Sequence, residues 1–248
     1  MSHLDSFHAD ARVAVIGASG GIGAALVEQL VALPTTGRVF AFGRRLDEQS
    51  DSHIHLAPID ITRERTVREA AAVATSEGPL DLVIVATGIL HNNNGIFPEK
   101  SLRNIDAGVM ADVLRINTIG PSLVAKHFLP CLRPGHKSVF AALSARVGSI
   151  GDNRLGGWTS YRASKAALNM VLKTLSIEHA RRFPDSVVIG LHPGTVDTRL
   201  SRPFQRNVAD GKLFSASQSA GYLLDVIEQV TPDDTGSVFA WDGSRIAE

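Results

Sequence analysis

Short apolar runs alternate with longer helical stretches along almost the whole chain. Because strands that alternate with helices form parallel sheets covered on both faces, the pattern predicts an α/β fold: a doubly wound Rossmann sheet of seven parallel strands with right-handed crossovers. The predicted strands are RVAVI (12–16), RVFAF (38–42), HIHLAPI (53–59), LDLVIVA (80–86), SVFAAL (138–143), SVVIGLH (186–192) and SVFAW (237–241). The predicted helices cover residues 22–33, 62–77, 105–132, 161–182 and 216–230.

The predicted helix over residues 161–182 is apolar around most of its circumference. A helix of this kind is buried on two sides. We therefore expect one face to pack on the sheet and the other on a second copy of the chain, which predicts a homodimer or homotetramer. Deep burial within one subunit is the alternative.

Composition narrows the class of protein. The 248 residues hold 25 basic and 25 acidic side chains, and 44% of residues are hydrophobic. This is typical of a globular protein, and we expect one domain over residues 1–248. With no basic excess we expect neither a nucleic-acid partner nor a membrane partner. The N-terminus has no signal-peptide pattern and no segment is long and apolar enough to span a bilayer, which predicts a cytoplasmic protein.

Metal and thiol chemistry find little support in the sequence. His53 and His55 would share one strand face without a third ligand nearby, so we expect no metal site. Cys131 is the only cysteine, which excludes an intramolecular disulfide. Its place at a predicted helix end favours a buried structural thiol over a nucleophile.

A glycine-rich turn, GASGGIG (17–23), joins the first predicted strand to the first helix. Gly17 permits a tight turn, Gly21 lets the backbone approach a pyrophosphate, and Gly23 allows close packing of helix on strand. The N–H groups of the helix N-terminus then face the phosphates. Glycines also close purely structural turns, but the order strand, turn, helix favours a dinucleotide site. Its expected contacts are Gly17, Ser19, Gly20, Gly21, Ile22 and Gly23.

The end of the second predicted strand bears on the choice of cofactor. FGRR (42–45) stands where an acidic residue would hold the ribose 2′-OH of NAD. Arg44 would instead pair with a 2′-phosphate, so NADP(H) is favoured over NAD(H). Asp60 and Ile61, after the third strand, are expected near the adenine. Two solvated arginines and an ordinary acidic residue at a helix start are the alternatives.

Tyr161 and Lys165 begin the fourth predicted helix at a spacing of four residues. This spacing places both side chains on one helix face. A nearby ammonium group favours phenolate, so we expect Lys165 to lower the pKa of Tyr161 and make it a proton donor and acceptor near neutrality.

These motifs together resemble the short-chain dehydrogenases/reductases over essentially the whole chain. The glycine turn, Asn117 in RINTIGP, YRASK (161–165) and HPGTVDT (192–198) stand in the family's order. SARVGSIGDN, GGWTSYRASKAALN and PEKSLRNID are most similar to the subgroup of C-factor-like and sniffer-like carbonyl reductases.

The resemblance implies roles for individual residues. Tyr161 would protonate the substrate oxygen during hydride transfer, a serine would hold that oxygen, and Lys165 would also bind the nicotinamide ribose. Asn117 would hold a water on the proton path, with a local helix kink as its alternative role. The nicotinamide would lie on the segment 193–198, with Pro193, Gly194, Val196 and Thr198 as expected contacts.

The chain departs from the family pattern at two places. After the fourth strand the usual Asn-Asn-Ala-Gly is replaced by Val85-Ala86-Thr87-Gly88, so Ala86, Thr87 and Gly88 are expected to contact the cofactor mainly through the backbone. Ala145 replaces the second serine of the usual pair. This leaves Ser144, at the end of the fifth strand, or Ser149, at the more usual distance from Tyr161. Ser144 is preferred because strand ends point into the cleft.

The sequence thus predicts an NADP-dependent oxidoreductase acting on a small carbonyl or alcohol substrate. Asn117, Ser144, Tyr161 and Lys165 are its expected catalytic residues. The alternative is a cofactor-binding signalling protein with little or no turnover. Phe204, Leu200 and Trp158 could line an apolar pocket, but they do not select among ketones, aldehydes and quinones.

Overall fold

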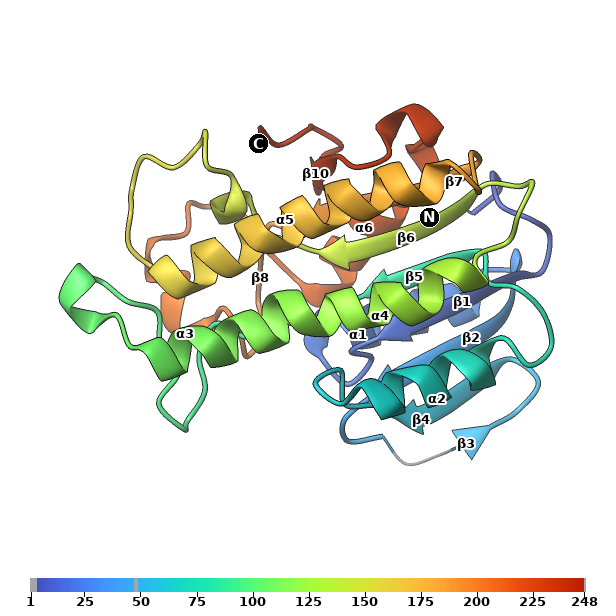
Figure 1. The fold of residues 1–248 in the computed structure, drawn as a ribbon, viewed down its shortest axis with the longest axis horizontal. Helices are drawn as coiled ribbons and strands as arrows, with labels where there is room; N and C mark the ends of the chain where they lie inside the picture. The colour runs from blue at the N-terminus through green and yellow to red at the C-terminus, as the bar shows by residue number, and fades with distance from the viewer. Residues whose placement is uncertain (1–3, 47–48, 248) are drawn as a thin grey trace.

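One mostly parallel sheet forms the centre of the molecule (Figure 1). The structure, a computed structural model, describes residues 4–46 and 49–247. The strand order is β10-β7-β6-β5-β1-β2-β4-β3. The strands are β1 (Ala11–Ile16), β2 (Thr36–Gly43), β3 (Gln49–Ser50), β4 (Ile54–Pro58), β5 (Leu82–Val85), β6 (Ser138–Leu143), β7 (Ser186–His192) and β10 (Val238–Ala240).

All seven predicted strands are present and pair in parallel. The doubly wound fold class is therefore confirmed. The sheet has eight strands rather than seven because β3 adds two residues antiparallel to β4 at the edge. A second, two-stranded sheet joins β8 (Thr195–Val196) to β9 (Leu213–Phe214), beyond the carboxyl end of β7.

Helices cover both faces of the sheet. One core cluster joins the sheet to α1 (Gly21–Ala32) and α6 (Ala216–Gln229), and the other joins it to α2 (Glu64–Ala74), α4 (Gly120–Phe128) and α5 (Thr159–Ala180). All residues of β5 and β6 are buried, as expected of strands packed on both faces. Figure 1 shows α4 and α5 lying side by side across the sheet. No helix in the described ranges is long and apolar enough to cross a bilayer.

The predicted helix over residues 105–132 is not one regular helix. It runs as α3 (Ala107–Leu114), a π-helical turn over Arg115–Ile119, α4 and a 3-10 turn over Leu129–Cys131. π-Helical turns are rare and frequently occur at functional sites. This one contains Asn117.

The strand order reverses between β1 and β5, where successive connections leave in opposite directions. Ligands of doubly wound sheets bind at such a switch point, outside the carboxyl ends of the strands. The glycine turn follows β1, and the segments that begin at Ala86, Ser144 and Pro193 follow β5, β6 and β7. The fold thus brings the predicted motifs to one edge of the sheet.

Candidate active site

The glycine turn leaves no room for side chains at two of its positions. Gly17 has φ 100°, and a Cβ there would lie 2.9 Å from the backbone of Ala86. At Gly23 a Cβ would lie 2.2 Å from the carbonyl oxygen of Gly17. The turn therefore needs glycine at both positions, as the sequence predicts. At Gly17 the end of β1 therefore packs closely against the start of the segment after β5.

The residues at the end of β1 fit a bound dinucleotide. No side chain of the described residues caps the N-terminus of α1, and its first turn has no acidic residue. Nearby, Thr87 Oγ1 is buried without a hydrogen-bond partner among the described residues, and its methyl group would lie 3.0 Å from a Cβ at Gly17. An uncapped helix N-terminus suits an anion, and an unpaired buried hydroxyl suits a polar ligand.

Ser19, Arg44 and Asp60 are gathered near the end of β2. A Cβ at Gly43 would lie 2.9 Å from Ser19 Oγ, so Ser19 lies against the residue before Arg44. Arg44 is exposed. Burial acts to raise the pKa of Asp60, but hydrogen bonds from Thr62 and the positive charges of Arg63 and Arg44 together lower it. Arg44 therefore lies close enough to act on Asp60.

Asp60 also has an ordinary structural role. Its carboxylate accepts hydrogen bonds from the backbone N and the hydroxyl of Thr62. The side chain of Ile61 is buried and packs at the position that a Cβ of Gly120 on α4 would occupy. Ile22 is partly buried at the start of α1. Any contact of Ile61 with a nucleotide would thus come from its backbone.

Lys165 is buried beneath the loops that follow β5 and β6. Its Nζ donates a hydrogen bond of 2.7 Å to the carbonyl of Leu143, and it lies 5.9 Å from the centroid of the Tyr161 ring. Gly148 packs against the same turn of α5, where a Cβ would lie 2.8 Å from Lys165 Cβ. Gly88 lies above the lysine, since its Cβ would stand 3.7 Å from Nζ. Tyr161 and Lys165 are therefore neighbours, as their spacing predicts, and Gly88 lies beside them.

The predicted effect of Lys165 on the acidity of Tyr161 is wrong for this structure. Burial raises the pKa of Tyr161 to about 12 and lowers that of Lys165 to about 8. Desolvation disfavours the charged form of each group, and it is the cause of both shifts. The phenol is therefore held protonated near neutrality, the form that can donate a proton to a substrate oxygen.

Asn117 connects the π-helical turn to two other segments. Its Oδ1 accepts from the backbone N of Ile89 at 2.7 Å, and its Nδ2 donates to Ile89 O at 2.9 Å and to Ser164 Oγ at 3.1 Å. The side chain is fully buried. Ser164 in turn donates to the carbonyl of Tyr161. Asn117 thus fixes the segment after β5 against the turn of α5 that carries Tyr161.

The two candidate serines have different surroundings. Ser144 follows β6 and is buried, but its hydroxyl donates a 2.5 Å hydrogen bond to Asn169 Oδ1, two helical turns beyond Tyr161 on α5. Ser149 accepts from the backbone N of Asp152 in the following loop. The hydroxyl of Ser144 is therefore directed to α5 rather than left free to meet a substrate. To hold a substrate oxygen, Ser144 would have to give up its bond to Asn169.

The segment 193–198 covers the glycine turn. A Cβ at Gly21 would lie 2.8 Å from Thr198 Cγ2, so the two segments touch. Gly194 has φ 78° and packs on Phe214, and Pro193 O accepts from Ser219 Oγ of α6. Val196 is buried in β8. The segment is thus anchored to α6 while its far end meets the predicted phosphate site.

The sequence pattern assigns no role to Glu99 and does not predict the conformation of Trp158. The buried Glu99 carboxylate accepts from both the backbone N and the hydroxyl of Ser160, and Glu99 O accepts from Trp158 N at 2.6 Å. Trp158 adopts a left-handed conformation with φ 54° just before α5. The consecutive glycines Gly156 and Gly157, which often mark left-handed backbone, were the available signal.

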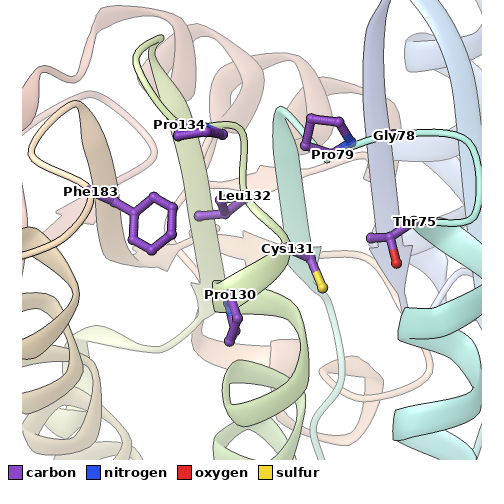
Figure 2. Close-up of a pocket in the computed structure, with 8 residues that line it drawn as sticks. All are labelled: Thr75, Gly78, Pro79, Pro130, Cys131, Leu132, Pro134 and Phe183. Carbon is purple, nitrogen blue, oxygen red and sulfur yellow. The ribbon is translucent and has the colours of Figure 1, made fainter.

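A surface pocket lies at the opposite end of the sheet (Figure 2). It is lined by Thr75, Gly78, Pro79, Pro130, Cys131, Leu132, Pro134 and Phe183, from segments that precede β5, β6 and β7. Cys131 is half-buried there, donates to His127 O, and has its pKa raised by burial. A thiol in this state is a poor nucleophile. The described residues include no group of three or more His, Cys, Asp or Glu side chains placed for a metal.

A doubly wound sheet with a glycine turn at its switch point and a tyrosine–lysine helix beside it defines a class of dinucleotide-dependent oxidoreductases. Comparison with known proteins identifies the family. A family model described as short chain dehydrogenase matches residues 11–209, and the chain belongs to this family of oxidoreductases.

Relatives and solved structures agree with this assignment. The chain is 30% identical to an uncharacterised oxidoreductase of Schizosaccharomyces pombe, covering 94% of this chain and 96% of that one. It is 33% identical to the C-signal protein of Myxococcus xanthus, covering 71% and 98%. NADPH-bound carbonyl reductase from chicken fatty liver superposes with a TM-score of 0.82 at 27% identity, covering 98% and 97%. The carbonyl reductase Sniffer of Drosophila melanogaster gives 0.82 at 24%, covering 97% and 100%.

Proposed function

We propose that this protein is an NADP(H)-dependent reductase of a small carbonyl compound, which also oxidises the corresponding alcohol in reverse. The observation that carries the proposal is the buried Lys165 beside Tyr161, with Gly88 and Asn117 packed around them. The carbonyl reductase from chicken fatty liver binds NADPH, which supports the cofactor assignment. We further propose that the chain acts in the cytoplasm as a homodimer or homotetramer.

The chain's own groups would share the work as follows. When bound, the nicotinamide supplies the hydride that reduces the carbonyl carbon. Tyr161, protonated because burial raises its pKa to about 12, donates a proton to the carbonyl oxygen. The ammonium group of Lys165 stabilises the phenolate left behind. Asn117 keeps Ile89 and Ser164 in place around this pair.

The remaining contacts divide between the two ends of the cofactor. The glycine turn would hold the pyrophosphate, Arg44 the 2′-phosphate, and Asp60 and Ile61 the adenine. Ala86, Thr87 and Gly88 would support the adenosine ribose. The segment 193–198 would hold the nicotinamide amide through Val196 and Thr198. Ser144 is proposed to hold the substrate oxygen after release from Asn169.

Replacement of the proton donor tests the reaction directly. We expect Tyr161→Phe to lower kcat/KM for carbonyl reduction roughly 100- to 10,000-fold, the usual contribution of a general acid. The measurement is NADPH consumption over a panel of aldehydes, ketones and quinones, with a melting curve as the control for folding. Wild-type turnover by a folded Tyr161→Phe protein would contradict the role of Tyr161.

Replacement of Arg44 tests the cofactor preference. A charge-assisted hydrogen bond to a phosphate is worth about 1.5–3 kcal/mol, so Arg44→Ala should lower kcat/KM for NADPH roughly 10- to 100-fold and that for NADH much less. Arg45→Ala, at the neighbouring exposed arginine, is the matched control. Equal losses with both cofactors, or a larger loss in Arg45→Ala, would exclude a specific contact between Arg44 and the 2′-phosphate.

The signalling alternative is testable with the same proteins. The similarity to the C-signal protein is the reason to consider a signalling role. A protein that only binds the cofactor would not, however, require a buried lysine beside a protonated tyrosine. Tight NADPH binding without turnover on any carbonyl compound would favour it over the reductase.

A further inference from the structure

A chain of aromatic rings extends outward from Tyr161. The Trp158 ring lies 6.3 Å from that of Tyr161 and 5.1 Å from that of Phe204, measured between centroids. Phe204 in turn lies 5.5 Å from Phe97 and 5.6 Å from His91. We name His91, Phe97, Trp158 and Phe204 the aromatic enclosure. It is connected ring to ring with the proposed proton donor.

The aromatic enclosure is assembled from three distant segments. His91 and Phe97 belong to the segment after β5, Trp158 precedes α5, and Phe204 lies in the 3-10 helix Arg202–Asn207 after β8. His91 Nε2 lies 3.0 Å from the carbonyl oxygen of Arg199, which joins the first segment to the third. All three segments follow the carboxyl ends of β5, β6 and β7, the edge at which ligands of this fold bind.

The place of Trp158 is fixed by its surroundings. Its left-handed conformation, φ 54° and ψ 41°, is rare for a residue with a bulky side chain. Such a conformation persists only where neighbouring contacts determine it. Here Trp158 N donates to Glu99 O, and the buried Glu99 carboxylate holds Ser160 two residues further on. These contacts hold the indole beside Tyr161 in spite of the local strain.

The rings of the enclosure are not core residues. Phe97 is 51% exposed, and His91, Trp158 and Phe204 are only partly buried. Neighbouring aromatic rings whose surfaces are partly open to water are typical of a binding surface. The nearby Arg199, Arg202 and Arg206 are exposed, whereas Trp158 and Phe204 lie against other aromatic rings.

Aromatic side chains favour aromatic ligands beyond the effect of buried area. Their quadrupoles give offset-stacked and edge-to-face contacts that a saturated group of similar size cannot make. We propose that the substrate is an aromatic carbonyl compound, with a flat ring attached directly to the carbonyl group, and that the aromatic enclosure receives this ring while Tyr161 faces the oxygen. This inference rests on the proposed reductase function and assigns the substrate class of the same site.

Matched substrates test the inference. Benzaldehyde and cyclohexanecarbaldehyde are similar in size, but only the first has an aromatic ring, as is also true of acetophenone and cyclohexyl methyl ketone. With NADPH, we expect kcat/KM to be about tenfold higher for the aromatic member of each pair, mainly through a lower KM. Conjugation makes an aromatic carbonyl less electrophilic, so intrinsic reactivity would act against this result.

Variants separate the ring contacts from intrinsic reactivity. Phe204→Leu and Phe97→Leu keep an apolar side chain but remove a ring, and we expect each to lower the aromatic-to-saturated ratio of kcat/KM roughly three- to fivefold. Phe183→Leu is the matched control, because Phe183 lies in the pocket at the opposite end of the sheet (Figure 2). The control should leave the ratio at the wild-type value.

The failure of this inference can be told apart from that of the proposed function. A ratio near one, or a ratio that neither leucine variant changes, would overturn the aromatic assignment while carbonyl turnover upheld the reductase. If no carbonyl compound of either kind were reduced by protein that binds NADPH, the proposed function would be overturned, and this inference with it.

Discussion

Burial, rather than charge attraction, determines the protonation of the two central residues. Tyr161 holds its proton because its pKa is raised to about 12. The pKa of Lys165 is lowered to about 8, within the pH range over which enzyme activity is commonly measured. The 2.7 Å hydrogen bond from Lys165 to Leu143 O holds the ammonium near the phenol but not against it. Of the two groups, Lys165 is therefore the one that changes charge near physiological pH.

A pH profile follows from these values. Raising the pH through about 8 removes the charge of Lys165 while free Tyr161 stays protonated. In the proposed reaction, the phenolate that proton donation would form would then lack its stabilising cation. We expect kcat/KM for reduction to be level below this pH and to fall above it, because this parameter reports the pKa values of the free enzyme. The measurement is NADPH-dependent reduction from about pH 6 to about pH 10. A level profile to the upper limit would refute the assigned role of Lys165.

The burial and the hydrogen-bond partners of individual side chains were the hardest features to predict from the sequence. The spacing of Tyr161 and Lys165 correctly predicts that they are neighbours, but burial, which decides their pKa values, depends on the whole fold. Glu99 stands in a loop, within PEKSLRNID, and nothing in this segment indicates that its partner is Ser160, 61 residues away. The hydrogen bond of Ser144 to Asn169 depends on how β6 and α5 pack, which periodicity does not reveal.

At the scale of elements, two backbone features shape the site. The π-helical turn between α3 and α4 carries Asn117, and the left-handed residue before α5 carries Trp158. The sequence predicts the helices on either side because their apolar positions recur at helical spacing. The sequence predicts one regular helix over residues 105–132 and not the break within it, because the residues of the π-helical turn have the same kind of composition as the helices around it.

The strand-to-helix turn offers a matched pair of substitutions. Gly23→Ala would drive a Cβ to 2.2 Å from Gly17 O, a backbone collision, whereas Gly20→Ala meets the same atom at 3.3 Å. We expect Gly23→Ala to lower the free energy of unfolding by about 2–4 kcal/mol and to abolish NADPH binding, and Gly20→Ala to cost less than about 1 kcal/mol. Urea titration and cofactor binding measure the two effects. Equal stability of the two variants would contradict the close packing of α1 on β1.

For the whole molecule, the fold class was predictable because strands buried on both faces read as continuous apolar runs. All seven runs became parallel strands. The eighth strand, Gln49–Ser50, consists of two exposed polar residues and leaves no such signal. The switch point between β1 and β5 explains why motifs far apart in the chain meet at one edge.

The predicted assembly depends on α5. Met170 and Ile177, seven residues apart and therefore on one helix face, are 66% and 53% exposed. If this face packs on a second subunit, replacing both with glutamate should shift the protein from dimer or tetramer to monomer in analytical ultracentrifugation. Val73→Glu, at a 41% exposed residue of α2, is the control. A monomeric wild type at micromolar concentration would contradict the prediction.

The strained position of Trp158 has an optical consequence. The chain has two tryptophans. The ring of Trp158 lies 6.3 Å from that of Tyr161, and the ring of Trp241 lies 4.6 Å from that of Phe214, measured between centroids, and packs against Gly194. In Trp241→Phe protein, the indole fluorescence would come from Trp158 alone. Its emission overlaps the absorption of reduced nicotinamide, so the quenching of this single residue would report the binding of the reduced cofactor in real time and without turnover.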